Sequence, residues 1–169
     1  DSKSVNEWLA AHQAEFLAHC ERTAVMGVEF PVLQPAYHAF YLLLHMLQHF
    51  LRAGFGLKLL CDWVVFWEKG YGSGVEERFF SMAEECRVMG FARLVTAVCV
   101  KYLGLSGEKV PLLLCRFDWE AEAANLEAFL TEILEAEEFG KSSADRMVAL
   151  RGTGWRDYCR EFHHQMLLT

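Results

Sequence analysis

Proline is scarce in this chain, and its positions limit the possible folds more than any other feature. The 169 residues contain three prolines, at positions 31, 35 and 111. Because proline breaks the interior of a helix, a chain with so few can form long helices over most of its length. The sequence is also 53% hydrophobic, enough for a core in a chain of this size. One ordered domain is therefore predicted, and disorder is not.

The spacing of apolar residues predicts an all-α fold, an irregular bundle of about six to seven helices. Ser4 and Glu7 have the spacing of a capping box, which predicts a first helix from there to about Glu21. Pro35 suits the first turn of a second helix, expected to reach about Ala53. Between them, residues 25–33 are expected to contain a short β element.

Further helices follow from glycines and capping residues. Ser73 and Glu76 again have capping-box spacing, so a helix is expected from there to residue 89, ended by Gly90. Asp118 is expected to cap a long acidic helix. The other helices are predicted at 57–69, as a segment buried on most sides, at 91–103, closed by a glycine, and from 142 onward, with a break at 151–154.

The sequence predicts a single helical domain over residues 1–169. The chain begins with Asp1, without an initiator Met or a signal peptide, so we expect it to be a fragment of a longer protein.

The most apolar window, 36–50, contains three histidines, whereas a membrane span needs about 20 mostly apolar residues. Six cysteines are scattered without a CxxC pair, a pattern typical of reduced, packed thiols. We therefore expect a cytoplasmic protein with no membrane partner.

Charge is unevenly distributed along the chain. The net charge is −7, and residues 117–140 hold eight acidic side chains and no basic one. The rest of the chain is nearly neutral, so it has no excess of basic residues for nucleic acid, and autonomous nucleic-acid binding is not expected. The acidic stretch is interpreted as the solvated face of a helix.

Polar residues on both sides of a glycine corner form the candidate phosphate-binding or nucleotide-binding set. Two helices are expected to meet at Gly54-Phe55-Gly56, which could bring cationic donors and one carboxylate together, as phosphate oxygens require. The set comprises His45, His49, Arg52, Lys58 and Asp62. Lys58 and Asp62, four residues apart, share one face of the second of these two helices. The alternative is that Arg52, Lys58 and Asp62 contain a buried or half-buried ion pair that fixes the helix crossing.

A metal site is a second interpretation of the same region. His38, His45 and His49 fall on one face of a helix with 3.6 residues per turn, and Asp62 could supply an oxygen ligand. The HExxH signature is absent, because Met46 and not a glutamate follows His45. Histidines held by hydrogen bonds within a helix interface are the simpler explanation.

Several catalytic signatures are missing from the sequence. There is no GxSxG and no P-loop. Gly72-Ser73 is similar to the glycine-serine turn of a nucleotidyltransferase, but the next aspartate after it is Asp118. Two-metal phosphoryl transfer needs paired carboxylates to hold Mg²⁺. No catalytic residue is therefore assigned in this chain.

Three motifs together resemble an uncharacterised bacterial nucleotidyltransferase-like family, over roughly residues 28–145. The most specific is His45-xxx-His49-Phe50 followed by Gly54-Phe55-Gly56-Leu57-Lys58-Leu59-Leu60-Cys61-Asp62-Trp63, where the family usually has Arg in place of Lys58. Weaker matches are Gly90-Phe91-Ala92 with Lys101 to Leu105, and Ile133-Leu134 with Phe139-Gly140-Lys141.

The resemblance implies a helical C-terminal region separated from an N-terminal α/β catalytic domain. That domain would carry the glycine-serine turn and paired aspartates, and Mg²⁺ would bind there, with no cofactor in this chain. By analogy, His45, His49, Lys58 and Asp62 would line a cleft for NTP and acceptor, facing the catalytic domain. Lys in place of Arg keeps the charge but loses the bidentate fork. The alternative function is a stand-alone helical protein-interaction module with structural histidines.

Overall fold

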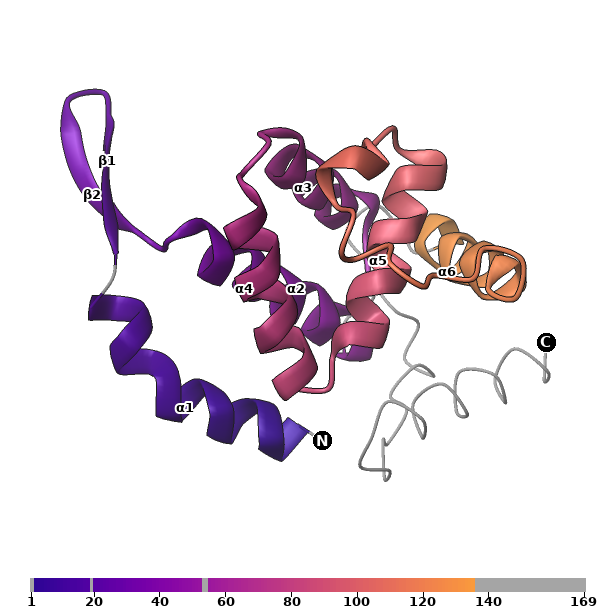
Figure 1. Ribbon diagram of the computed structural model, residues 1–169, viewed down its shortest axis with the longest axis horizontal. Helices are drawn as coiled ribbons and strands as arrows, with labels where there is room; N and C mark the ends of the chain where they lie inside the picture. The colour runs from indigo at the N-terminus through magenta and orange to yellow at the C-terminus, as the bar shows by residue number, and fades with distance from the viewer. Residues whose placement is uncertain (1, 19, 53–54, 136–169) are drawn as a thin grey trace.

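The structure is a computed structural model that describes residues 2–18, 20–52 and 55–135. The side chains of residues 2–6, 13, 51–52 and 135 also lie outside the described part. Within it the chain forms helices and one β-hairpin (Figure 1). The elements are α1 Ser2–Ala18, β1 Glu21–Val25, β2 Val28–Val32, α2 Pro35–Arg52, α3 Leu57–Glu68, α4 Ser73–Glu85, α5 Met89–Tyr102, the 3-10 turn η1 Gly107–Lys109, and α6 Ala123–Glu135. The predicted all-α bundle with a short β element is confirmed.

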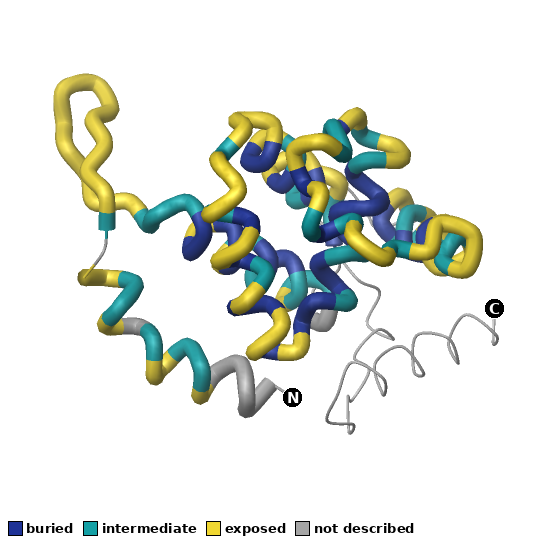
Figure 2. Tube along the Cα trace, viewed as in Figure 1, coloured by how far each residue is buried: buried dark blue, intermediate teal, exposed yellow. Residues whose placement is uncertain are grey.

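Buried residues of α2, α3, α4 and α5 form the core (Figure 2), and many of them are large aromatic residues. Trp63 and Trp67 of α3 both contact Phe79 of α4, with ring centroids 5.6 and 5.7 Å apart and steep angles between the rings. The Trp63 indole N–H donates to the Thr96 hydroxyl of α5 at 3.1 Å. Burial of such large rings is the main stabilising contribution in a core of this kind.

α3 begins and ends close to the predicted residues, but less of the helix is buried than the sequence predicted. Leu60, Trp63, Phe66 and Trp67 face the core, while the opposite side of the helix is exposed, so the expectation of burial on most sides is wrong. Of the other apolar residues of α3, Leu57 and Val65 are exposed, whereas Leu59 and Val64 are partly buried against the core. An exposed apolar residue is ordinary, so apolar composition did not by itself fix the burial of this helix.

The boundary between α4 and α5 lies earlier than predicted. α4 ends at Glu85, and Gly90 lies inside α5 and does not end a helix. Arg87 instead makes the turn with a left-handed φ of 58°, and the N–H of Val88 donates back to the Ala83 carbonyl at 2.9 Å. Gly104, with φ of 78°, closes α5 as expected.

Glu76 does not act in a capping box. Gly72 occupies the N-cap of α4 and no side chain caps that helix. The Glu76 carboxylate is buried and accepts the N–H groups of Leu112 and Leu113 at 2.8 and 2.9 Å. Burial raises its pKa, although both hydrogen bonds act in the opposite direction. Glu76 therefore holds the turns of residues 111–116 against α4.

α6 begins at Ala123, later than expected, and the turn before it, not the helix itself, is capped by Asp118. Its Oδ1 accepts the N–H groups of Glu120 and Ala121 at 3.1 and 3.0 Å, and a short turn leads into the helix. Leu126, Phe129 and Ile133 form the buried side of α6. The predicted end of this helix near Glu138 and the predicted helical region from Ser142 lie outside the described residues.

The cysteines differ in burial, so the prediction of packed thiols holds for only some of them. Cys86 and Cys99 are buried, which raises their pKa values to about 11 and about 12. Cys61 and Cys115 are exposed, because each lies on the solvent side of its segment. Cys159 is outside the described residues. No helix in the described part of the chain has both the length and the apolar character to cross a bilayer.

The first helix lies earlier in the chain than predicted, since α1 begins at Ser2 and ends at Ala18, and β1 begins at Glu21. α1 is fixed to the bundle by a polar contact. The Tyr37 hydroxyl of α2 donates to Glu15 of α1 at 2.6 Å, and Arg78 of α4 donates to the same carboxylate oxygen at 2.7 Å. From the end of α1 the hairpin extends away from the helices (Figure 1).

Candidate functional site

Three aromatic side chains follow one another along the outer face of α2. The rings of His45 and His49 meet edge to face with centroids 4.5 Å apart. Tyr41 lies parallel to His45, with centroids 6.3 Å apart. Both histidines are partly exposed, and Tyr41 is exposed. Tyr41 was not among the predicted site residues, although its four-residue spacing from His45 is a signal that it shares the face of the two histidines.

The opposite face of α2 explains why these side chains point outward. Ala39, Leu43 and Met46 are buried and recur at the three- and four-residue spacing of a helix face packed on a core. The histidines occupy the complementary positions. They are therefore not buried in a helix interface, and the explanation that they serve as core hydrogen-bonding residues is not supported for His45 and His49.

His38 lies at the other end of α2 from His49. Its ring meets Phe66 of α3 edge to face at 5.4 Å. Partial burial lowers its pKa, and the charge of nearby Lys69 lowers it further. Because the start of α2 thus lies beside the end of α3, the two helices run in opposite directions.

The four residues of the metal alternative do not come together. Among the described residues, no group of three or more His, Cys, Asp or Glu side chains could hold a metal ion. A metal site formed by His38, His45, His49 and Asp62 is therefore contradicted. Seven residues of helix advance roughly 10 Å at 1.5 Å per residue, so side chains on one face of α2 do not share one point.

Lys58 and Asp62 lie one turn apart on the exposed side of α3. They are four residues apart, yet no ion pair joins these two side chains. A buried or half-buried ion pair between Lys58 and Asp62 therefore does not fix the helix crossing. Because α2 ends at residue 52 and α3 begins at 57, His49 and Lys58 occupy the same end of the antiparallel helix pair. The side chain of Arg52, also predicted for the site, is outside the described part.

A comparison with known protein families identifies the group to which this fold belongs. The family described as "Uncharacterised nucleotidyltransferase" matches residues 4–104. The match thus begins earlier and ends sooner than the 28–145 expected from the motifs, and it includes α1 through α5 with the hairpin. No curated protein and no solved structure matches the chain. More than half of the chain lies within the match, so this chain belongs to that nucleotidyltransferase family.

Proposed function

We propose that this chain is the helical region of a nucleotidyltransferase and helps a neighbouring α/β catalytic domain to bind NTP and its acceptor. The supporting observation is the family match, because residues 4–104 include both helices that carry the candidate site. The exposed face of α2 and the exposed face of α3 supply the polar groups for it. In this proposal the chain binds NTP and acceptor, and it transfers no nucleotidyl group by itself.

Each candidate residue has a role that its chemistry allows. Lys58 is a compact charge that would pair with a phosphate oxygen, and Arg52 would add a second cationic donor. His45 and His49 would donate N–H groups to phosphate oxygens or to the ribose. Asp62 would accept from a ribose hydroxyl or orient a donor.

Mg²⁺ does not fit the described residues of this chain. The ion needs oxygen ligands in near-octahedral geometry, usually one or two carboxylates together with substrate phosphates. Asp62 is exposed and belongs to no group of metal ligands in the described part. We therefore place Mg²⁺ with the carboxylates of the catalytic domain and derive no step of this chain through it.

Titration of the purified chain with ATP, followed by calorimetry, tests the role of Lys58. Lys58→Ala should weaken binding at least tenfold, since a charge-assisted hydrogen bond contributes about 1.5–3 kcal/mol and about 1.4 kcal/mol is a factor of ten. Lys58→Arg should strengthen it, because arginine supplies two parallel donors to a phosphate. Lys69→Ala is the matched control, because Lys69 is an exposed lysine at the far end of α3, near His38.

The results can contradict the proposal in two ways. If Lys58→Ala and Lys69→Ala weaken ATP binding equally, the effect is one of general charge and not of a site. If the purified chain transfers a nucleoside monophosphate from NTP to any acceptor, its assignment as a binding region is wrong. Transfer would be measured with labelled NTP and separation of the products by mass.

A further inference from the structure

The hairpin β1–β2 has one apolar face and one polar face. Its antiparallel register pairs Glu21 with Val32, Thr23 with Phe30 and Val25 with Val28. Because side chains alternate between faces along a strand, one face carries Val25, Val28, Phe30 and Val32, together with Thr23 and, at the base of the hairpin, Glu21. The other carries Arg22, Ala24, Glu29 and Pro31, with an ion pair of 3.0 Å between Arg22 and Glu29. Such alternation is the pattern of a sheet that packs one face on a core.

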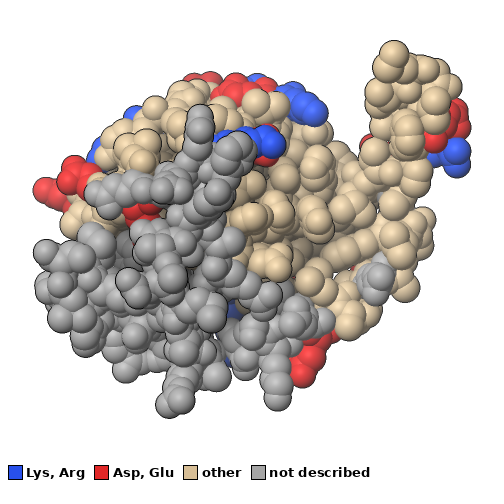
Figure 3. Space-filling view, turned by 180° about the vertical axis from the view of Figure 1, so that it is seen from behind, with Lys and Arg blue, Asp and Glu red and all other residues tan. Residues whose placement is uncertain are grey.

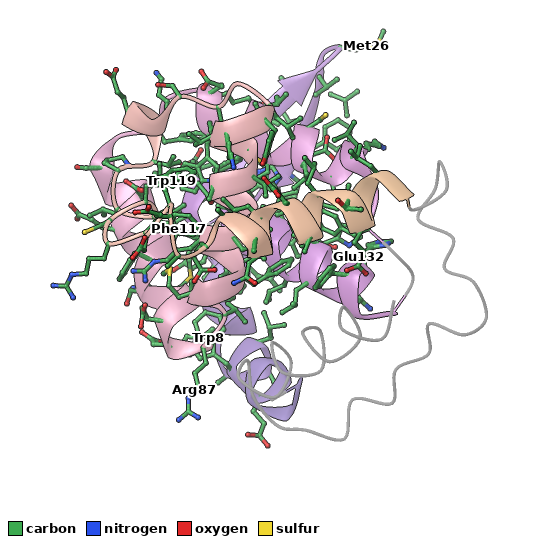
Figure 4. All side chains as sticks on the ribbon, turned by 90° about the vertical axis from the view of Figure 1, so that its right-hand side faces the viewer. Trp8, Met26, Arg87, Phe117, Trp119 and Glu132 are labelled. Atoms are coloured by element: carbon green, nitrogen blue, oxygen red, sulfur yellow. The ribbon has the colours of Figure 1, made fainter. Side chains whose placement is uncertain are left out.

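No part of the described structure covers the apolar face. Val25 is 57% exposed, Val28 55% and Phe30 47%, and Met26 at the tip is 99% exposed. The hairpin is exposed along its whole length in Figure 2, and in Figure 3 it projects from the body with its charged side chains gathered on one side. Figure 4 places Met26 at the far end, away from the helices. An isolated two-stranded hairpin is marginally stable in water, so a partner for this face is expected.

The turn determines which backbone groups point outward. Met26 and Gly27 have φ of 52° and 81°, the signs of a type I′ turn with a two-residue loop. In such a hairpin the flanking pair, Val25 and Val28, is hydrogen bonded, and hydrogen-bonded pairs then alternate with non-bonded pairs. Arg22 and Ala24 therefore direct their N–H groups away from β2.

The two edges of the hairpin differ for this reason. The outward positions of β2 are Glu29 and Pro31, and proline has no N–H to donate to another strand. The outer edge of β2 is thus partly blocked, as natural sheets block an edge that must stay unpaired. The outer edge of β1 keeps both donors. The hairpin consequently offers one open edge and one apolar face.

A second copy of the chain cannot satisfy both features through the hairpin. Pairing of two β1 edges leaves the apolar faces open, and packing of two apolar faces leaves the edges open. The hairpin spans residues 21–32, whereas a stable interface uses about 20–30 residues on each side. A β-sheet that already covers a core satisfies the edge and the face at once.

We propose that β1–β2 adds two strands to the open edge of a β-sheet in the catalytic α/β domain, with β1 paired to that sheet's edge strand. The apolar face then continues the layer of that domain's core, and β2 becomes the new outer edge. This inference rests on the proposed function, which supplies the neighbouring domain. The hairpin lies within residues 4–104, so its partner is expected to be common to the family and not particular to this chain.

Hydrogen exchange tests the pairing. The product of the native gene, purified intact, is compared with the 169-residue chain. In the 169-residue chain the outward amides of Arg22 and Ala24 should exchange nearly as fast as unprotected ones. In the native gene product they should exchange at least 100-fold more slowly. Equal exchange of both amides in the two proteins overturns the proposal. Protection that depends on concentration and accompanies a doubled mass overturns it in favour of a second copy.

Two proline substitutions form a matched pair for the native gene product. Ala24 and Glu29 face each other in a non-bonded pair, so a proline at either position removes an outward N–H and keeps the bonds between β1 and β2. Ala24→Pro should abolish the slow exchange of Arg22, whereas Glu29→Pro should preserve it. The reverse ranking, or equal loss in both variants, would rule out docking through β1.

Measurements on the native gene product distinguish this inference from the proposed function. Slow exchange at Arg22 and Ala24 without any effect of Lys58→Ala on ATP binding supports the docking and rejects the nucleotide site. A nucleotide site that depends on Lys58, with fast exchange at Arg22 and Ala24, supports the site and rejects the docking.

Discussion

Glu76 is a buried carboxylate whose two acceptor bonds join distant segments of the chain. It belongs to α4, and its partners are the N–H groups of Leu112 and Leu113. Its pKa is raised by burial above the ordinary value of 4.5. A raised pKa means that the unfolded chain loses this proton first as pH rises. The contribution of Glu76 to stability is therefore complete below about pH 4.5 and decreases as pH rises through the folded-state pKa.

Glu76→Gln should remove this pH dependence and keep the acceptor oxygen. We expect the stability of this variant, relative to the natural chain, to increase between pH 4.5 and 7, as measured by urea unfolding at several pH values. Glu76→Ala should lower the free energy of unfolding by about 2–4 kcal/mol, because two N–H groups lose their acceptor. If the free energies of unfolding of the Gln variant and the natural chain change in parallel with pH, the buried charge of Glu76 does not lower stability.

The Thr96 hydroxyl is a second buried polar contact, here between α5 and α3. It accepts the Trp63 indole N–H at 3.1 Å and donates to the Ala92 carbonyl at 2.7 Å. Thr96→Val keeps the shape but leaves the indole N–H without an acceptor, at a cost of about 1–3 kcal/mol. The indole proton of Trp63 should then exchange faster in NMR. Thr96→Ser retains the hydroxyl and should leave that exchange rate unchanged; faster exchange in both variants would contradict the assigned role.

At the scale of elements, the hairpin contains a local conflict at its turn. Met26 adopts a left-handed φ, which costs an L-residue other than Gly, Asn or Asp roughly 1–2 kcal/mol. Its side chain is almost fully exposed, so replacement loses no packing. A type I′ turn prefers Asn-Gly, and Gly27 already follows.

Met26→Asn should therefore stabilise the hairpin by about 0.5–1 kcal/mol. The inward amides of Thr23 and Phe30 report this as slower hydrogen exchange in the 169-residue chain. Met26→Val, with a β-branched side chain in the same turn, is expected to speed the exchange of both amides. If the two variants behave alike, the turn does not limit the stability of the hairpin.

At the scale of the whole molecule, the core continues beyond the family match, which ends at residue 104. Between residue 105 and the end of the described part at 135, six apolar residues are buried: Leu105, Val110, Leu113, Leu126, Phe129 and Ile133. Phe129 of α6 meets Phe50 and Phe55 with ring centroids 5.2 and 5.7 Å apart. The segment 105–135 is therefore part of the same core.

A chain ending at Gly104 should fail to fold cooperatively. Loss of six buried side chains, at about 1.5–3 kcal/mol each, is comparable with the roughly 5–15 kcal/mol that stabilises a whole domain. Near-ultraviolet circular dichroism and thermal unfolding provide the measurement. A chain ending at Glu135 is the comparison and should keep a cooperative transition. Equal transitions in both chains would show that residues 4–104 form an independent unit.

The sequence by itself determined most of the local structure. Scarce prolines and apolar spacing predicted the helical class, Pro35 marked the start of α2, and Gly104 closed α5. These features are local, because proline and glycine act on the backbone of their own turn. Arg87 shows the limit: an arginine, not Gly90, made the turn between α4 and α5, since the packing of both helices overrode the local preference.

Only the tertiary structure decided which polar residues are partners and which surfaces stay open. The capping-box spacing of Glu76 was local, but its hydrogen bonds reach residues 112 and 113. Periodicity placed His38 and His49 on one face, while the rise of the helix separated them. The apolar face of β1–β2 is exposed because the hairpin projects away from the described helices (Figure 1). Periodicity specifies which side of an element is apolar, and the arrangement of elements in space decides what that side meets.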